Sequence, residues 1–268
     1  MLHLIKIEWL KIKGYKTFWV LTTLFLVSIV GINYVAYSIK MQTAQNNAQV
    51  NLILGAPFDF PNVWHTVTYF SSFLLFIPGL MIITSVTNEY SYKTTRQNII
   101  DGWSRLQFIQ VKIALAVILS FASTIFVFLT SLLFGIISGS SFSFLKIEYI
   151  GYYFIQAVSY SMVALLFSLL IKRSGLAIGA FFLYSLIIEN AIGALINYYS
   201  RSQGSIKMNG LGDYLPLNTV DYLIPFPFFR NLVQLSTQPP IFLLLGLSVA
   251  YLALYYFISV KKFQKDDL

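Results

Sequence analysis

The side chains that could perform chemistry are few and scattered along the chain. There is no cysteine, and the only histidines in the sequence are His3 and His65, so a thiolate site or a histidine-rich metal site lacks its ligands. The motifs H-E-x-x-H and G-x-S-x-G are absent, and so is the G-x-x-x-x-G-K-[ST] loop that would hold a nucleotide. We therefore expect no catalytic residue, no metal site and no cofactor site in this chain, and no enzyme activity of its own.

One carboxylate, Glu189, lies inside a long apolar stretch at residues 176–198. A charge at such a depth in a bilayer is costly, and it usually faces the interior of a helix bundle or an aqueous cavity. We therefore predict Glu189 as a contact on a translocation path. Two alternatives stay open: a glutamate that fixes helix packing, with Asn190 as its partner, or a residue of the outer half that reaches water.

The densest set of charged groups between two apolar stretches lies at residues 88–106: Glu89, Lys93, Arg96, Asp101 and Arg105. Glu89 and Lys93 stand four residues apart in the favourable order, which predicts a short surface helix with an ion pair. Asp101 and Gly102 are expected to end that helix. Ser104 is a typical cap for the helix that follows.

The elements that carry these groups are predicted from hydropathy, since 57% of the residues are hydrophobic and 10% are charged. A bilayer crossing needs roughly 20 apolar residues in a helix. Six stretches reach that length: residues 18–37, 64–86, 108–137, 152–171, 176–198 and 241–260. The sequence therefore predicts one all-α membrane domain over residues 1–268, with six transmembrane helices.

Lysine and arginine avoid the apolar stretches and favour one side of the predicted membrane. With six crossings, thirteen cations share the side of both termini: Lys6, Lys11, Lys13, Lys16, Lys93, Arg96, Arg105, Lys112, Lys172, Arg173, Lys261, Lys262 and Lys265. The other side holds Lys40, Lys146, Arg201, Lys207 and Arg230. Because cytoplasmic loops carry the excess of cations, we predict a multi-pass protein of the cytoplasmic (inner) membrane with both termini in the cytoplasm. Its net charge of +8 needs no nucleic acid as an explanation, although it favours contact with anionic lipid.

Two further segments flank this plan. In residues 1–16, the side chains of Ile5, Trp9 and Ile12 recur at helical spacing, which predicts an amphipathic helix in the membrane interface, the alternative being a plain basic tail. Residues 201–240 form an apolar, proline-broken outer segment. It is expected to dip into the outer interface or shelter against other helices, and the alternative is a loop that lies on the membrane surface.

Taken in order along the chain, these features resemble the permease subunit of an ABC-2 type ABC transporter. The likeness covers essentially the whole chain. It comprises Ile7-Glu8-Trp9-Leu10-Lys11, the E-x-x-x-x-T-x-R pattern that begins at Glu89, Trp103-Ser104-Arg105, the downstream Lys112 and the basic tail that begins at Lys261. The resemblance implies an ABC-2, type V exporter-like transmembrane domain with an N-terminal interfacial helix.

The resemblance also implies partners and roles. Such permeases dimerise with a second copy or a paralogous permease, and each pairs with a cytosolic ABC ATPase subunit that binds the ATP and magnesium. Residues 88–106 would be the coupling loop, with these candidates for ATPase contact: Glu89, Tyr90, Lys93, Arg96 and Arg105. Positive-inside anchoring is the alternative for the three cations of that set. The expected function is ATP-driven transport, export rather than import, and the alternative is a secondary transporter or channel subunit not driven by ATP.

Overall fold

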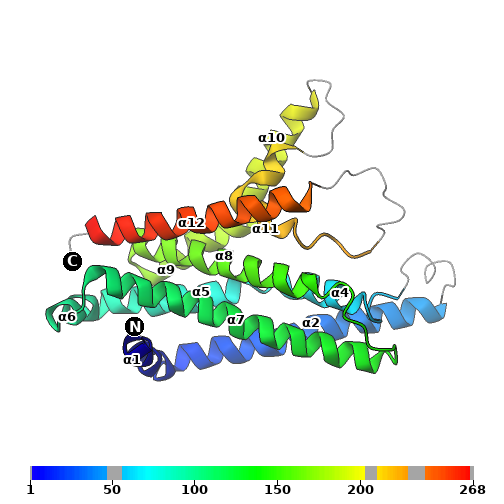
Figure 1. Cartoon of the computed structure of the whole chain (residues 1–268), viewed down its shortest axis with the longest axis horizontal. Helices are drawn as coiled ribbons and strands as arrows, with labels where there is room; N and C mark the ends of the chain where they lie inside the picture. The colour runs from blue at the N-terminus through cyan, green and yellow to red at the C-terminus, as the bar shows by residue number, and fades with distance from the viewer. Residues whose placement is uncertain (1, 47–55, 203–209, 229–238, 266–268) are drawn as a thin grey trace.

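The chain forms an elongated bundle of helices. The computed structural model describes residues 2–46, 56–202, 210–228 and 239–265, and all regular structure in these ranges is helical (Figure 1). Within these ranges, five helices are long and apolar enough to cross a membrane, or six when one bent pair counts as a single span. The predicted all-α membrane fold is confirmed.

The elements follow one another in this order: α1 Leu2–Lys13, α2 Lys16–Asn46, α4 Val63–Ser72, α5 Phe76–Ser91, α6 Thr94–Ile100, α7 Arg105–Ile137, α8 Glu148–Ile171, α9 Ser174–Leu183, the π-helical turn η1 Tyr184–Ile188, α10 Glu189–Ser202, the 3₁₀ turn η2 Leu211–Tyr214, α11 Pro216–Asp221 and α12 Ile241–Lys265. Five spans are longer than the apolar stretches predict, because the helices continue into polar residues at their ends. The first runs over 16–46 instead of 18–37 and the fifth over 174–202, while the third begins at Arg105, the fourth begins at Glu148 and the sixth ends at Lys265.

The second predicted span, residues 64–86, is not one straight helix. It is divided into α4 and α5, whose axes differ by 45° across a break of three residues. Pro78 accounts for the break, because proline has no N–H to donate to the carbonyl four residues earlier and its ring clashes with that carbonyl. The carbonyl of Leu74 accepts instead from the N–H of Ile77 at 3.0 Å.

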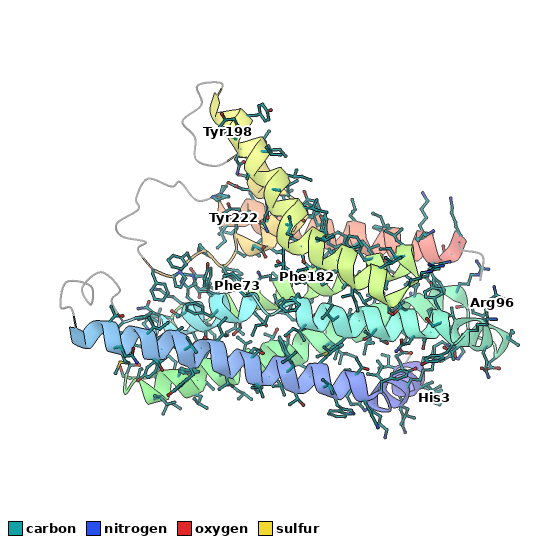
Figure 2. All side chains as sticks on the ribbon, turned by 180° about the vertical axis from the view of Figure 1, so that it is seen from behind. His3, Phe73, Arg96, Phe182, Tyr198 and Tyr222 are labelled. Carbon is teal, nitrogen blue, oxygen red and sulfur yellow. The ribbon has the colours of Figure 1, made fainter. Side chains whose placement is uncertain are left out.

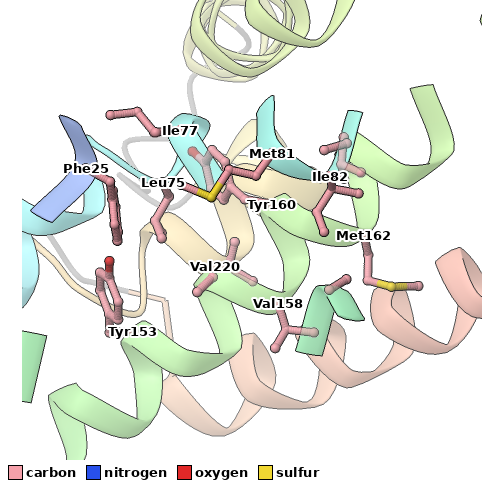
Figure 3. Close-up of a cluster of buried hydrophobic side chains, with 14 of the residues drawn as sticks. Phe25, Leu75, Ile77, Met81, Ile82, Tyr153, Val158, Tyr160, Met162 and Val220 are labelled. Carbon is pink, nitrogen blue, oxygen red and sulfur yellow. The ribbon is translucent and has the colours of Figure 1, made fainter. Parts of the chain in front are cut away.

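Helix α8 lies at the centre of the bundle and packs against α4, α5, α7, α9, α11 and α12. Its side chains Tyr153 and Leu165 are fully buried. Figure 3 shows Tyr153 among the buried side chains of this core. Gly79 of α5 allows one close approach, since a Cβ there would lie 2.6 Å from the ring of Phe181 on α9. The core therefore sits around α8, whereas few residues of α2, α9–α10 and α12 are fully buried.

Residues 210–228 of the predicted outer segment pack against helices. Residues 203–209 and 229–238 of the same segment lie outside the described residues. Its helix α11 contacts α8, α10 and α12. The carbonyl of Pro225 lies 2.6 Å from Nε2 of His65, whose ring stacks on Tyr149. The hydroxyl of Tyr251 donates to the carbonyl of Tyr214 at 2.8 Å. The described part thus packs against other helices, which is one of the arrangements that the sequence left open.

Helices α1 and α6 and the last turn of α12 lie at the same end of the bundle (Figure 1). A hydrogen bond from Nη1 of Arg105 to the carbonyl of Gln264, 2.7 Å long, joins the start of α7 to the end of α12. We call this end of the molecule the α6 end. Helix α10 leaves the bundle partway along its length and points away from it (Figure 1).

Candidate functional site

The predicted coupling segment, residues 88–106, forms the turn between α5 and α7. Helix α5 continues through Glu89 to Ser91, and Lys93 then takes a left-handed conformation with φ 58° before α6 begins. Gly102 has φ +99° and follows the end of α6, as predicted. The cap at Ser104 is confirmed: its hydroxyl accepts from the N–H of Gln107 at 3.1 Å, and the N–H of Ser104 donates to Oε1 of Gln107 at 3.0 Å.

The surface ion pair expected between Glu89 and Lys93 does not form. The left-handed turn at Lys93 interrupts the helix, so the two residues are not stacked on one helical face as i,i+4 pairing requires. The carboxylate of Glu89 points inward instead and is 3% exposed, whereas Lys93 is exposed.

Glu89 belongs to a buried group of four ionised residues that we call the ion cluster: Glu8, Lys11, Glu89 and Lys112. Nζ of Lys112 pairs with Oε1 of Glu8 and lies 3.1 Å from Oε2 of Glu89. Nζ of Lys11 lies 2.9 Å from Oε1 of Glu89 and 3.8 Å from Oε2 of Glu8. The cluster therefore joins α1, α5 and α7 through alternating charges.

The charges of the ion cluster balance, with two carboxylates and two ammonium groups. Lys112, Glu8 and Glu89 are each 3% exposed or less, while the Lys11 side chain keeps 25% of its surface in solvent. Charges this deeply buried are stable only when each has a partner. The cluster thus fixes α1 against α5 and α7, and Lys11 extends it to α6 through a 3.4 Å hydrogen bond to Oδ1 of Asn98.

A basic groove lies beside the ion cluster at the α6 end. It encloses about 360 Å³ between the α5–α6 turn and the junction of α8 with α9. We define it by its cations: Lys93, Arg96, Lys172 and Arg173. Among the described residues, the one carboxylate that lines it is Glu89, which already faces Lys11 and Lys112. The groove therefore presents an excess of positive charge to whatever contacts it.

The predicted coupling residues lie around this groove with one exception. Glu89, Tyr90, Lys93 and Arg96 line it, and Nζ of Lys172 stands 5.3 Å above the centre of the Tyr90 ring. Arg105 lies elsewhere at the same end, bonded to Gln264. Figure 2 shows Arg96 and His3 at that end of the molecule.

The predicted amphipathic stripe on α1 is divided between two environments. Ile12 is 2% exposed and Ile5 is half-buried, whereas Trp9 is 42% exposed and meets the Phe18 ring edge-on. The charged Glu8, also 2% exposed, is buried as deeply as the apolar Ile12. Sequence reasoning did not single out Glu8, and its only signal was its place in the motif at residues 7–11.

Glu189 is buried, and its carboxylate is directed at α11. Oε1 accepts hydrogen bonds from the backbone N–H groups of Leu217 at 2.5 Å and Asn218 at 2.9 Å. These groups belong to the first turn of α11, which has no partners within its own helix for them. Asn190 does not pair with Glu189 but donates to the carbonyl of Leu186 at 3.2 Å. The arrangement gives Glu189 the role of a tether that holds α11 against α10.

Replacing Glu189 with alanine should destabilise the protein more than Glu189→Gln, because alanine leaves two buried N–H groups without an acceptor. We expect a loss of about 1–3 kcal/mol for the alanine variant. The measurement is the thermal unfolding midpoint of each purified variant, with the exposed neighbour substitution Asn190→Ala as control. If Glu189→Ala unfolds at the wild-type temperature, the tether assignment is wrong.

A second cavity, the polar cavity, lies towards the opposite end and encloses about 500 Å³. Its walls come from α4, the α4–α5 break, α8, η1, α10 and residues 213–226. The labelled rings of Phe73 and Tyr222 mark it where α10 leaves the bundle (Figure 2). Glu189 is not among its lining residues, whereas Asp221 is. Sequence reasoning overlooked this carboxylate because it lies within the proline-broken segment at 201–240, outside any predicted span.

No group of three or more metal-ligating side chains occurs among the described residues. Comparison with known proteins gives one family: the family model described as ABC-2 family transporter protein matches residues 4–195. The match includes the ion cluster and the basic groove but ends within α10, before the segment at 210–228. No curated protein matches the chain.

Proposed function

Because this chain belongs to the ABC-2 family of transporter proteins, we propose that it is the permease subunit of an ATP-driven exporter. It works as a dimer of permeases, each paired with a separate cytosolic subunit that binds ATP and magnesium. The sequence has no nucleotide-binding loop of the form G-x-x-x-x-G-K-[ST], so the energy has to come from a partner.

The observation that supports this proposal most is the ion cluster beside the basic groove. A partner that docks in the groove contacts the α5–α6 turn, where Glu89 connects that turn to α1 and α7. Helices held together by buried ion pairs move as one body rather than independently. Closure of two ATPases on nucleotide would therefore push α1, α5 and α7 of each permease together.

Helix α5, which the ion cluster joins to α1 and α7, begins directly after the break between α4 and α5. The break at residues 73–75 sits next to the polar cavity, whose walls include Ser72, Phe73 and Phe76. Hinges are usually a few residues at the end of an element that absorb a change of backbone angles. Movement of α5 would thus change the width of the polar cavity, and in the dimer it would open a path for the solute.

The test is co-expression with an ATP-binding subunit that carries the nucleotide loop and comes from a neighbouring reading frame. We expect the two chains to co-purify and to hydrolyse ATP in lipid, at a rate that responds to a panel of candidate solutes. Solute transport that proceeds without any ATP-binding subunit would instead favour the alternative, a secondary transporter or channel.

The proposed orientation places the α6 end in the cytoplasm and the loop between α7 and α8 on the opposite side of the inner membrane. Because the chain has no cysteine, one introduced thiol reports its own location. Ile100 is 83% exposed at the α6 end, and Leu145 is 71% exposed in the opposite loop between α7 and α8. In intact spheroplasts, a membrane-impermeant maleimide should label Leu145→Cys and spare Ile100→Cys, and permeabilisation should make both reactive. The reverse pattern would overturn the orientation.

A further inference from the structure

The polar cavity is acidic. Its described lining includes Asp213 and Asp221 and contains no lysine, arginine or histidine. Asp213 is committed to its own loop, because its oxygens accept from Nδ2 of Asn197 at 2.7 Å and from the N–H of Gly210 at 3.2 Å. Asp221 is therefore the negative group that the cavity can offer to a ligand.

Asp221 is held in a fixed position by two donors from α8. Its Oδ1 accepts from Nε2 of Gln156 at 2.8 Å and from the hydroxyl of Tyr160 at 3.1 Å, and that hydroxyl is also 3.1 Å from Oδ2. Both donors are neutral, so the charge of the carboxylate is oriented but not compensated.

The amide of Gln156 adds a second acceptor beside the carboxylate. Gln156 is 2% exposed, and its Oε1 has no hydrogen-bond partner among the described residues. Buried polar atoms are nearly always paired, so an orphaned acceptor at the wall of a cavity points to a donor that arrives with a ligand. One oxygen of Asp221 and this amide oxygen together suit a group that donates at least two N–H bonds and carries positive charge.

Aromatic rings form much of the remaining wall. Tyr69 meets both Phe73 and Phe226 edge-on, with ring centres 5.2 Å and 5.4 Å apart, and Tyr222 is 42% exposed. Such rings pack against apolar bodies and also attract cations to their faces. The volume of about 500 Å³ is that of a small-molecule site rather than of a site for a folded partner.

We propose that the polar cavity binds a protonated amine carried on an apolar or aromatic body, with Asp221 as its counter-ion, Gln156 as a second acceptor and the aromatic rings around the body. The proposal rests on the proposed function in one respect: the amine that binds here would be the transported solute. Binding itself requires no ATPase, so it can be tested alone.

The titration of Asp221 gives the site a pH dependence. Burial raises the pKa of Asp221 to about 7, and the charge of Glu189 on α10 adds to the rise, while the hydrogen bonds from Gln156 and Tyr160 oppose it. Tyr69 of α4 is the further titratable group that interacts with it. An amine pairs with the ionised carboxylate, which is the minor form below pH 7. The dissociation constant should therefore be constant above pH 7 and rise about tenfold for each pH unit below it.

The experiment uses the purified full chain in lipid nanodiscs without nucleotide. The probe is dansylcadaverine, a primary amine on an aromatic body, followed by fluorescence titration, and the matched ligand is its N-acetylated form, which lacks the charge. We expect saturable binding of the amine at pH 8, weaker by about 10- to 100-fold for the acetylated form and for Asp221→Asn, since one charge-assisted bond is lost. Glu148→Gln removes the same charge from an exposed site outside the cavity and should bind like wild type.

The two comparisons are independent, because the acetylated probe is tested on unaltered protein and does not depend on how Asp221→Asn folds. Tyr222→Ala should weaken binding of both ligands by removing part of the wall they share. Equal affinity for the amine and its acetylated form at pH 8 would overturn the proposal, and so would an affinity that does not change between pH 8 and pH 6. If the amine binds but is not transported on ATP hydrolysis, the proposed binding site stands and the proposed exporter function is wrong.

Discussion

Replacing Lys112 with methionine should be among the most destabilising single substitutions in this protein. The ammonium group of Lys112 lies between Glu8 and Glu89, and all three side chains are almost completely buried. Methionine keeps much of the apolar volume but leaves two carboxylates with only Lys11 as a partner. Removing one partner of a buried ion pair costs about 3–5 kcal/mol, because the remaining charge stays in a medium of low polarity.

The measurement is the thermal midpoint and the yield of monodisperse protein for Lys112→Met. Lys93→Met is the matched control, since it removes the same type of side chain from an exposed position of the same segment. We expect Lys93→Met to behave like wild type. Equal stability of the two variants would show that the ion cluster does not hold the helices together.

A second substitution separates loss of charge balance from loss of packing. Glu8→Gln in the Lys112→Met background removes the one carboxylate that is left in excess, and the pair of Lys11 with Glu89, 2.9 Å apart, stays in place. The double variant should be more stable than Lys112→Met alone, by about 0.5–3 kcal/mol as is typical of residues in one network. If Lys112→Met instead loses stability through poor packing, Glu8→Gln would not relieve the defect. The double variant would then be less stable than Lys112→Met alone.

The sequence predicts the membrane plan well because that plan depends on local composition. Apolar stretches of sufficient length give the spans, and Ser104 with Gln107 gives the start of α7 through a capping box that acts over three residues. The bend between α4 and α5 also had a local signal, Pro78, which an estimate from hydropathy alone does not weigh. Local rules therefore recover the elements, and also the places where the elements stop.

The candidate sites are less accessible from sequence because they depend on pairs far apart in the chain. Glu8 and Lys112 are separated by 104 positions, and Gln156 and Asp221 by 65. Nothing in the neighbourhood of Glu8 distinguishes a buried glutamate on an interfacial helix from an exposed one. Glu89 illustrates the consequence, since its nearest oppositely charged residue along the helix, Lys93, is not its partner in the fold.

Those partners decide which residues of the coupling segment are available to another protein. Glu89 is occupied inside the ion cluster, so its substitution would disturb the permease itself. Lys93 and Arg96 are exposed and line the basic groove, which makes them the groups that can meet an acidic segment of an ATPase directly. A test of coupling therefore belongs at these two cations rather than at the conspicuous carboxylate.

Reversing both charges with Lys93→Glu and Arg96→Glu should uncouple the permease from its ATP-binding subunit. The substitutions place two negative charges where the groove now offers positive ones, and like charges brought together at an interface are strongly unfavourable. We expect the affinity for the ATPase, and the ATP hydrolysis that depends on the permease, to fall at least about tenfold. The residual affinity should also lose its dependence on salt, because the attraction that salt screens is gone.

The matched control is Lys261→Glu with Lys265→Glu, which makes the same change of net charge at the same end of the molecule. Both residues are exposed near the end of α12, and neither lines the basic groove. An effect of overall charge or of lipid attraction would appear equally in both double variants. A specific docking surface predicts loss of co-purification in the groove variant alone, with the thermal midpoint of both proteins unchanged. If the control fails to bind the ATPase as well, the docking surface extends beyond the groove and coupling cannot be assigned to Lys93 and Arg96.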